Sequence, residues 1–427
     1  MVLAEPVEMC TRLAAQVEEV LETGRRHESR ARALPLEKRV RGDRCPMREA
    51  VQPAGADRTG GGEHRHFLPC RCRYLRRPDL PVRDEDGIGE SPADVDAENG
   101  HGPTLVRITQ AVRAFEAEMA ARGASAELRL VGAGGEPVDL RRTLASHGVA
   151  DLPPNRIDDE SWTLELTLPL DGKKPRTVSV SAGRKGYASL DVLGRPPGKS
   201  DLETLQAKVA HVLRLDEDLT PFYEVAATDP DLAWATAGAG RMIRSPTVFE
   251  DVVKTICTTN CTWSATVRMV SALVEQLGEP AAGADGPFGR AFPTPEAMAR
   301  KSSAFYTETV RAGYRGVYLR ALAKSVASGQ LDLEHLGRAS RGELPDDELA
   351  ARLLALPGVG PYAAAHVMML LGRYSRLILD SWTRPKYLRV SGSRRAKDTT
   401  IERRFRRYGD YAGLAFWLYL TRDWVDV

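Results

Sequence analysis

The sequence predicts a mainly α-helical protein in which a disordered N-terminal extension and a small α+β domain precede a helical body. Three observations indicate this fold class. From residue 201 onward, apolar residues recur at helical spacing, and Gly or Pro separates most of the runs. Before that point, residues 162–168 and 177–180 have apolar or β-branched side chains at alternate positions, as strands do. Residues 24–103 show neither pattern.

These patterns divide the chain into three parts, 1–103, 104–200 and 201–427. The middle part is expected to begin with a helix over 105–122 and to continue with the two strands; it holds no catalytic constellation. In the third part, the predicted helices cover 201–213, 246–277, 295–301 with Thr294 as N-cap, 314–328, 346–355, 361–371 and 413–420.

The first part, 1–103, is predicted to be disordered, because Arg, Gly, Pro and Asp dominate much of it and few side chains could build a core. His64, His66, Cys70 and Cys72 could in principle hold a zinc ion. Their spacing matches no usual structural zinc site, and no second half-site follows. We therefore predict neither a metal nor another cofactor.

Overall charge gives no argument for nucleic-acid binding, since the 427 residues have a net charge of only +2. Locally the balance differs: from Ser381 to Asp410, ten Lys or Arg stand against three acidic residues. A basic stretch of this kind suits a phosphate backbone, although a solvated helix face would have the same composition.

The six cysteines form no regular framework, and no apolar run reaches the length of about 20 residues that a membrane span needs. Acidic residues between Met1 and Val20 also argue against a secretory or import signal. We expect a cytoplasmic protein that does not bind membranes and is a monomer.

The most informative segment is Leu356-Pro357-Gly358-Val359-Gly360-Pro361-Tyr362. Two glycines flank one aliphatic residue between two predicted helices, and Pro361 suits the first position of the second helix. Gly358 and Gly360 allow a tight turn and a close approach, while Val359 can enter the core. Backbone N–H groups would then converge at a helix N-terminus, where a phosphate can bind. A simple C-cap followed by a turn would explain the pattern equally well.

Twenty residues after Gly360, one helix and one extended run later, lies Asp380. This arrangement resembles the helix-hairpin-helix DNA glycosylases, the superfamily of the 8-oxoguanine, 3-methyladenine and endonuclease III-type enzymes. The resemblance covers about half of the chain and implies a two-lobed helical body. It also implies that Asp380 lies beside the sugar of a flipped nucleotide, where a carboxylate opposes positive charge or activates water. An N-cap role ahead of Ser381 and Trp382 is compatible with this one.

Two further segments extend the resemblance. Ile256-Cys257-Thr258-Thr259-Asn260 looks like the segment in which 8-oxoguanine glycosylases place an asparagine in the gap left by the flipped base, which gives Asn260 that role. Gly313-Tyr314-Arg315 resembles the family's Gly-Tyr-Arg turn. There the aromatic ring, here Tyr314, is a wedge beside the orphaned base, with Arg315 next to it. Tyr314 could otherwise be a core aromatic at a helix start.

Two departures from the family indicate its monofunctional branch. Bifunctional members carry a lysine two residues after the second hairpin glycine, where this chain has Tyr362, and no lysine lies between Lys324 and Lys386. The iron–sulfur cysteines of the endonuclease III type are also missing, because the last cysteine is Cys261.

The base pocket is expected to include Tyr362 and His366, which are four residues apart and share one face of a helix. The resemblance implies that this face meets the flipped base. An aromatic ring there could stack on the base, and His366 could donate a hydrogen bond to one of its edges. Trp382, two residues after the acid, could close the wall. Ordinary core packing is the alternative for all three.

The resulting hypothesis is a monofunctional DNA glycosylase that flips a damaged base out of duplex DNA and hydrolyses its N-glycosidic bond. The alternative is a non-catalytic DNA-binding protein that keeps the hairpin without a competent pocket, or a different nucleic-acid enzyme on the same fold. The damaged base stays open, because the wedge motifs favour 8-oxoguanine enzymes whereas an aromatic at the lysine position favours 3-methyladenine enzymes.

Overall fold

The computed structural model describes residues 122–281 and 286–425. The chain divides into two units, and all described residues belong to the one that excludes Ser29–Arg107. The predicted disorder of 1–103 and the candidate zinc residues lie outside the described residues. So does the predicted helix 105–122 except for its last residue, Arg122, which begins a strand.

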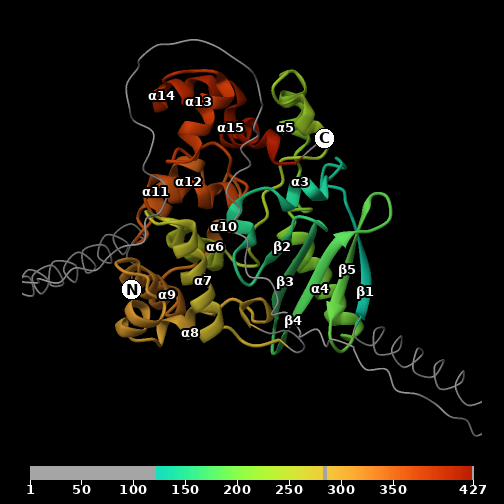
Figure 1. The fold of residues 1–427 in the computed structure, drawn as a ribbon, viewed down its shortest axis with the longest axis vertical. Coiled ribbons are helices and arrows are strands. Elements are labelled where there is room, and N and C mark those ends of the chain that lie inside the picture. Colours follow the sequence, from blue (N-terminus) through green and yellow to red (C-terminus); the bar gives the residue numbers. More distant parts are fainter. Residues whose placement is uncertain (1–121, 282–285, 426–427) are drawn as a thin grey trace, which may run out of the picture. The chain divides into compact units, whose positions relative to one another are not determined.

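An antiparallel sheet of five strands, in the order β1-β5-β4-β3-β2, forms the first described part (Figure 1). Alternate residues point inward: Leu164, Leu166 and Leu168 of β3 are buried with Val178 and Val180 of β4. Helix α4 packs on the sheet through a shared cluster. The bounds are β1 Arg122–Arg129, α3 Leu140–Leu144, η1 Gly148–Asp151, β2 Arg156–Asp158, β3 Thr163–Leu170, β4 Lys173–Ala182, β5 Tyr187–Leu193 and α4 Lys199–Val212.

The two predicted strands are confirmed as β3 and β4, but the sequence interpretation missed β1, β2 and β5. In β5, the buried residues Ala188, Leu190 and Val192 alternate with the polar residues Ser189 and Asp191. Strand β1 is short of aliphatic side chains, and it is held by pairing along β5 instead. Pairing with a neighbour is a non-local contact, so local alternation does not reveal it.

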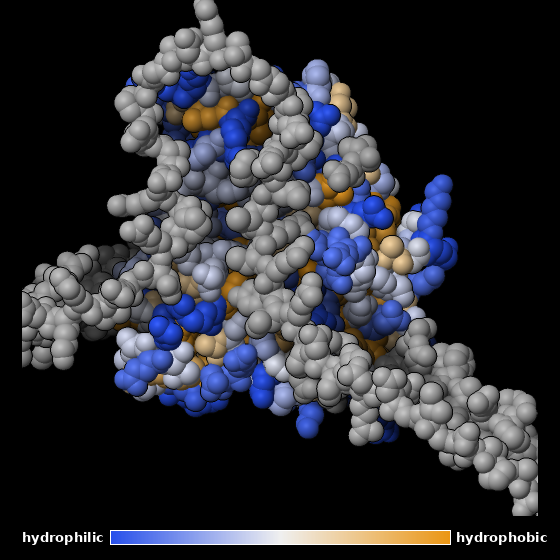
Figure 2. Space-filling view, viewed as in Figure 1, coloured by the Kyte–Doolittle hydropathy of each residue, from blue (hydrophilic) through white to orange (hydrophobic). Residues whose placement is uncertain are grey.

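Helices make up the rest of the described chain, and none of the described helices is long and apolar enough to cross a membrane. In the view of Figure 2, the surface over α8 and α9 is mainly hydrophilic. The bounds are α5 Thr220–Ala227, η2 Ala233–Ala237, α6 Val248–Thr258, α7 Trp263–Leu277, η3 Gly286–Gly289, α8 Pro295–Ala299, η4 Phe305–Thr309, α9 Arg315–Ala327, α10 Leu333–Arg338, α11 Asp346–Leu354, α12 Pro361–Leu370, α13 Thr383–Ser391, α14 Asp398–Phe405, η5 Arg406–Tyr411, α15 Ala412–Thr421 and η6 Arg422–Trp424.

Two apolar clusters divide these helices into two lobes, with α12 between them. One cluster joins α6, α7 and α9 to α11, and the other joins α5 to α13, α14 and α15. Helix α12 gives Ala364 and Val367 to the first cluster and Ala365 and Met369 to the second, and Tyr362 packs against both. The predicted two-lobed helical body behind a small sheet is thus confirmed. The start of α12 lies where the lobes meet.

The single helix predicted over 246–277 is wrong, because the structure has two helices there. Helix α6 ends at Thr258, and Asn260 has a φ of +46°, which an α-helix does not allow. The side chain of Thr262 then caps α7 by accepting a hydrogen bond from the amide of Ala265. A run of Thr and Asn offers the backbone such alternative hydrogen bonds, and this favours a break over a continuous helix.

Candidate active site

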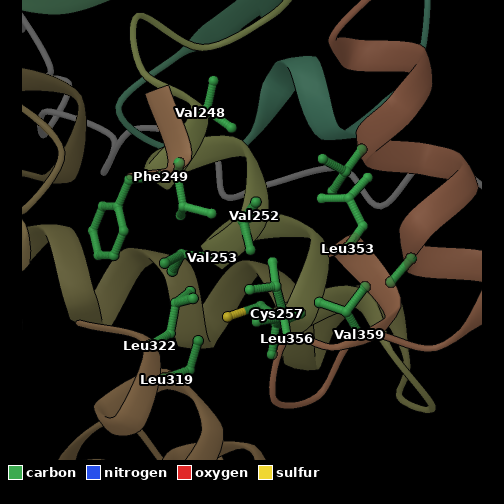
Figure 3. Packing of buried hydrophobic residues seen from close by; sticks show 14 of the residues in the cluster. Val248, Phe249, Val252, Val253, Cys257, Leu319, Leu322, Leu353, Leu356 and Val359 are labelled. Carbon is green, nitrogen blue, oxygen red and sulfur yellow. The ribbon is translucent and has the colours of Figure 1, made fainter. Parts of the chain in front are cut away.

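The hairpin between α11 and α12 differs at its two glycines. Gly358 has a φ of +80°, and a Cβ there would lie 2.7 Å from Cδ2 of Tyr318. Gly360 has an ordinary φ of −96°, and a Cβ there would meet no atom within 4 Å. Val359 is buried, and Figure 3 shows it with Leu356 near Cys257 of α6. Gly358 therefore shapes the turn, whereas Gly360 presents its backbone to open space.

Two backbone donors at the start of α12 have no hydrogen-bond partner among the residues that the structure describes. Pro361 occupies the first helical position, and the first N–H that bonds within the helix is that of Ala364, which donates to Gly360. The N–H groups of Tyr362 and Ala363 have no partner within the helix. Together with the helix dipole, they make this end attractive to an anion.

Asp380 fixes the turn that leads into α13, and one of its carboxylate oxygens has no partner among the described residues. Its Oδ1 accepts hydrogen bonds from the amides of Trp382 at 2.8 Å and Thr383 at 2.6 Å. Its own amide donates to Oγ1 of Thr383 at 2.8 Å. Within the described residues, Oδ2 accepts no hydrogen bond and the carboxylate has no ion-pair partner. Arg384, one turn further on, is held instead by Asp398 through two bonds of 2.8 Å.

Tyr362 lies close enough to Asp380 to feel its charge. Burial raises the pKa of Tyr362, and the Asp380 carboxylate acts in the same direction. The phenol oxygen is hydrogen-bonded to Oγ1 of Thr258 at 3.2 Å. The ring of His366 lies edge-on to that of Tyr362, with 5.9 Å between the ring centroids. The structure thus brings together the predicted acid and two of the three predicted pocket residues.

His147, from the segment between α3 and η1, joins this group, although the sequence offered no motif for it. Its ring centroid lies 5.7 Å from that of His366. Burial lowers the pKa of His147 to about 4 and that of His366 to about 3, so both rings are neutral near pH 7. Nε2 of His147 lies 2.7 Å from the carbonyl oxygen of Ile243 and must carry the proton. Its Nδ1 is then an acceptor, and it has no partner in the described chain.

Trp382 is 38% exposed and forms an aromatic cluster with Trp417 and Trp424, each with a centroid separation of 5.6 Å. Trp417 is anchored by its indole N–H, which donates to the carbonyl of Ser146 at 2.7 Å. The ring that follows the acid is therefore supported from behind and open on one side.

The turn between α6 and α7 contacts the start of α9. Nδ2 of Asn260 donates to the hydroxyl of Tyr314 at 3.3 Å, and the Tyr314 ring is 44% exposed. Arg315, by contrast, is buried: it donates to the carbonyl of Thr259 at 2.8 Å and stacks on the ring of Tyr314 at 4.5 Å. Its hydrogen bonds go to the protein itself, so it positions the turn and the ring.

Ion pairs occupy part of the basic stretch. Lys386 binds Asp423 at 2.5 Å, Arg404 binds Asp231 at 3.0 Å, and Arg407 binds Asp229. Six basic residues have no ion-pair partner among the described residues and are exposed: Arg389, Arg394, Arg395, Lys397, Arg403 and Arg406. No group of three or more His, Cys, Asp or Glu suited to a metal occurs in residues 122–281 and 286–425.

The hairpin between two helical lobes, followed by an acid at the start of the next helix, defines the class of fold. The 3-methyladenine DNA glycosylase of Archaeoglobus fulgidus superimposes with a TM-score of 0.54 at 18% identity, covering 70% of this chain and 100% of that one. The 8-oxoguanine glycosylase/lyase of Clostridium acetobutylicum, in complex with double-stranded DNA, gives 0.53 at 18%, covering 71% and 99%. The predicted helix-hairpin-helix glycosylase fold is confirmed.

In sequence, the chain is similar to the DNA-3-methyladenine glycosylase of Bacillus subtilis, with 29% identity over 162 residues. The match covers 38% of this chain and 52% of the relative, so the chain spans about half the length of the curated relative it matches. No protein-family model matches the chain.

Proposed function

We propose that the chain is a DNA glycosylase that extrudes a damaged base from duplex DNA and hydrolyses its N-glycosidic bond without cutting the strand. The observation that supports this most is Asp380. This residue lies one helix after the hairpin. Two backbone amides fix its Oδ1, and its Oδ2 has no partner in the described chain. Its negative charge helps to raise the pKa of Tyr362. A fixed carboxylate with a free oxygen suits a reaction that builds positive charge on a sugar.

The other residues fit the steps around the reaction. The free N–H groups at the start of α12 would bind a phosphate and hold the duplex. Asn260 and Tyr314, hydrogen-bonded to each other, would fill the gap and stack beside the orphaned base. Tyr362 would stack on the extruded base. Oδ2 of Asp380 would orient a water molecule toward the anomeric carbon.

A panel of duplexes, each with one damaged base, tests this proposal by measuring free base. The curated relative is named for 3-methyladenine, and solved neighbours are named for 3-methyladenine and 8-oxoguanine, so the panel includes alkylated and oxidised purines. Binding to duplexes without release from any of them would favour a DNA-binding protein that has kept the fold alone.

Gly360→Val should weaken binding to damaged and undamaged duplexes alike, by at least roughly tenfold or ~1.4 kcal/mol. A side chain at position 360 enters open space in the free protein, so the fold survives, but it blocks the approach of a phosphate. Anisotropy titrations with both duplexes measure this. Gly342→Val is the matched control, because it also adds a side chain with at most a distant neighbour, 3.9 Å away. Unchanged affinity would reduce the hairpin to a structural turn. Gly358→Val is less useful, because Tyr318 occupies the space.

Base release should leave an intact abasic strand. Strand cutting in bifunctional relatives needs an amine that forms a Schiff base, and a phenol at position 362 cannot do so. Two lysines elsewhere are already engaged: Lys254 is buried against Glu250 at 2.7 Å, and Lys386 is bound to Asp423. Borohydride treatment during turnover should trap no covalent complex. A trapped adduct that disappears in Lys324→Gln or Lys386→Gln would overturn the hydrolytic assignment.

A further inference from the structure

Six large hydrophobic side chains are exposed in the described part of the chain, and three of them are aromatic. Two of the three, Tyr314 and Trp382, already belong to the proposed site. The third, Trp263, is 46% exposed and has no role so far. It is the first residue of α7, three residues after Asn260.

The hairpin and the Asn260 turn are linked by direct contacts. Gly358 lies against the ring of Tyr318, whose centroid is 5.9 Å from that of Tyr314. The hydroxyl of Tyr314 then accepts the hydrogen bond from Asn260. This series leads from the proposed phosphate site to the proposed gap residue.

A second series of contacts starts from Trp263, at the end of the same turn. Trp263 lies beside Gly148, where an added Cβ would be 3.5 Å from Cη2 of the indole. Gly148 follows His147, whose ring meets that of His366, and His366 meets Tyr362 at the start of α12. This series, with the chain connection between Gly148 and His147 as one of its links, therefore joins Trp263 to Tyr362 at the start of α12.

We propose that Trp263 is a further aromatic contact for DNA and that its indole, like the ring of Tyr362, stacks on the base that leaves the helix. The inference rests on the proposed function. Tyr314 contacts the turn through its hydrogen bond with Asn260 and is assigned to the orphaned base, whereas Trp263 begins the helix after the turn and contacts Gly148, next to His147.

The surroundings of Trp263 suit a nucleobase. The indole offers a large apolar face, and Gly148 next to it is exposed and has no side chain to fill the space over it. His147, the residue before Gly148, has a buried acceptor, Nδ1, without a partner in the described residues. An aromatic face followed by an unused acceptor matches the two features of a base, its ring and its polar edge.

The test compares two duplexes of one sequence by anisotropy with the full chain. One is fully paired, and the other has a single 2-aminopurine opposite a tetrahydrofuran abasic analogue. Trp263→Ala should weaken binding to the 2-aminopurine duplex about tenfold, which is about 1.4 kcal/mol, and leave the paired duplex within about twofold. Trp263→Phe should retain most of the affinity. The bound 2-aminopurine should be brighter with Trp263→Ala than with wild type, because the stacked indole quenches it.

Val225→Ala is the control, since Val225 is another exposed apolar residue and belongs to neither series of contacts. Equal losses on both duplexes, or no loss on either, would overturn the role of Trp263. If Gly360→Val weakens both duplexes and Trp263→Ala weakens neither, the proposed function stands and this inference falls. If wild type binds neither duplex, both fall.

Discussion

Replacing Asp380 by asparagine should abolish base release while duplex binding stays within roughly threefold of wild type. The carboxylate would act on charge that exists only in the transition state, so its loss affects the rate and spares affinity. The structure makes asparagine the informative choice. Its Oδ1 can accept the same hydrogen bonds from Trp382 and Thr383, so the turn that leads into α13 is kept and only the charge is lost.

Single-turnover release from the best lesion of the panel measures the effect. Asp398→Asn is the matched control. It removes the carboxylate of Asp398, the first residue of α14, and the partner of this carboxylate is Arg384. We expect near-normal rates from the control. A variant Asp380→Asn with more than about a tenth of the wild-type rate would have lost less than ~1.4 kcal/mol of transition-state stabilisation, too little for the proposed catalytic group.

Arg241→Met should lower the free energy of unfolding by about 3–5 kcal/mol. The Arg241 side chain is 0% exposed and pairs with Glu136, which is also buried. Arg241 donates to the carbonyl of Glu217 at 3.0 Å, and Glu136 accepts from the amide of Leu219 at 2.8 Å. Removing the guanidinium leaves a carboxylate buried without its countercharge, and this is the costly situation for a buried pair.

Urea unfolding of the variant and of a control tests this expectation. The control is Arg352→Met, which breaks an exposed ion pair with Glu348 within one helix. We expect it to lower the free energy of unfolding by at most about 0.5 kcal/mol. The double variant Glu136→Gln, Arg241→Met should recover part of the loss, because it removes both charges. A loss below about 1 kcal/mol for Arg241→Met would mean that water reaches this pair.

This ion pair also joins regions that the sequence separates. Glu136 precedes α3 in the predicted domain 104–200, and Arg241 precedes α6 in the predicted domain 201–427. His147 bonds to Ile243 across the same boundary, and α4 packs on the sheet although it starts next to residue 200. The division into two domains stays a prediction, whereas the contacts between them are extensive.

Features that depend on local chemistry could be predicted from the amino-acid sequence alone. The glycines around Val359, Pro361 at a helix start and the N-cap at Thr294 act within a few residues, so their pattern predicted the hairpin and the helix starts correctly. The alternation in β3 likewise follows from burial of one face. With the resemblance to the glycosylases, this sufficed for the fold and for Asp380 as the candidate acid.

Which side chains meet, by contrast, depends on the tertiary structure. It broke the predicted helix at Asn260, buried Arg315 against Thr259, and brought His147 to His366 from a part of the chain with no recognisable motif. It also distinguished the two hairpin glycines, since only Gly358 has a ring against it. Such contacts join residues far apart in the chain, and their stability comes from burial and long-range hydrogen bonds, which leave no periodic pattern in the sequence.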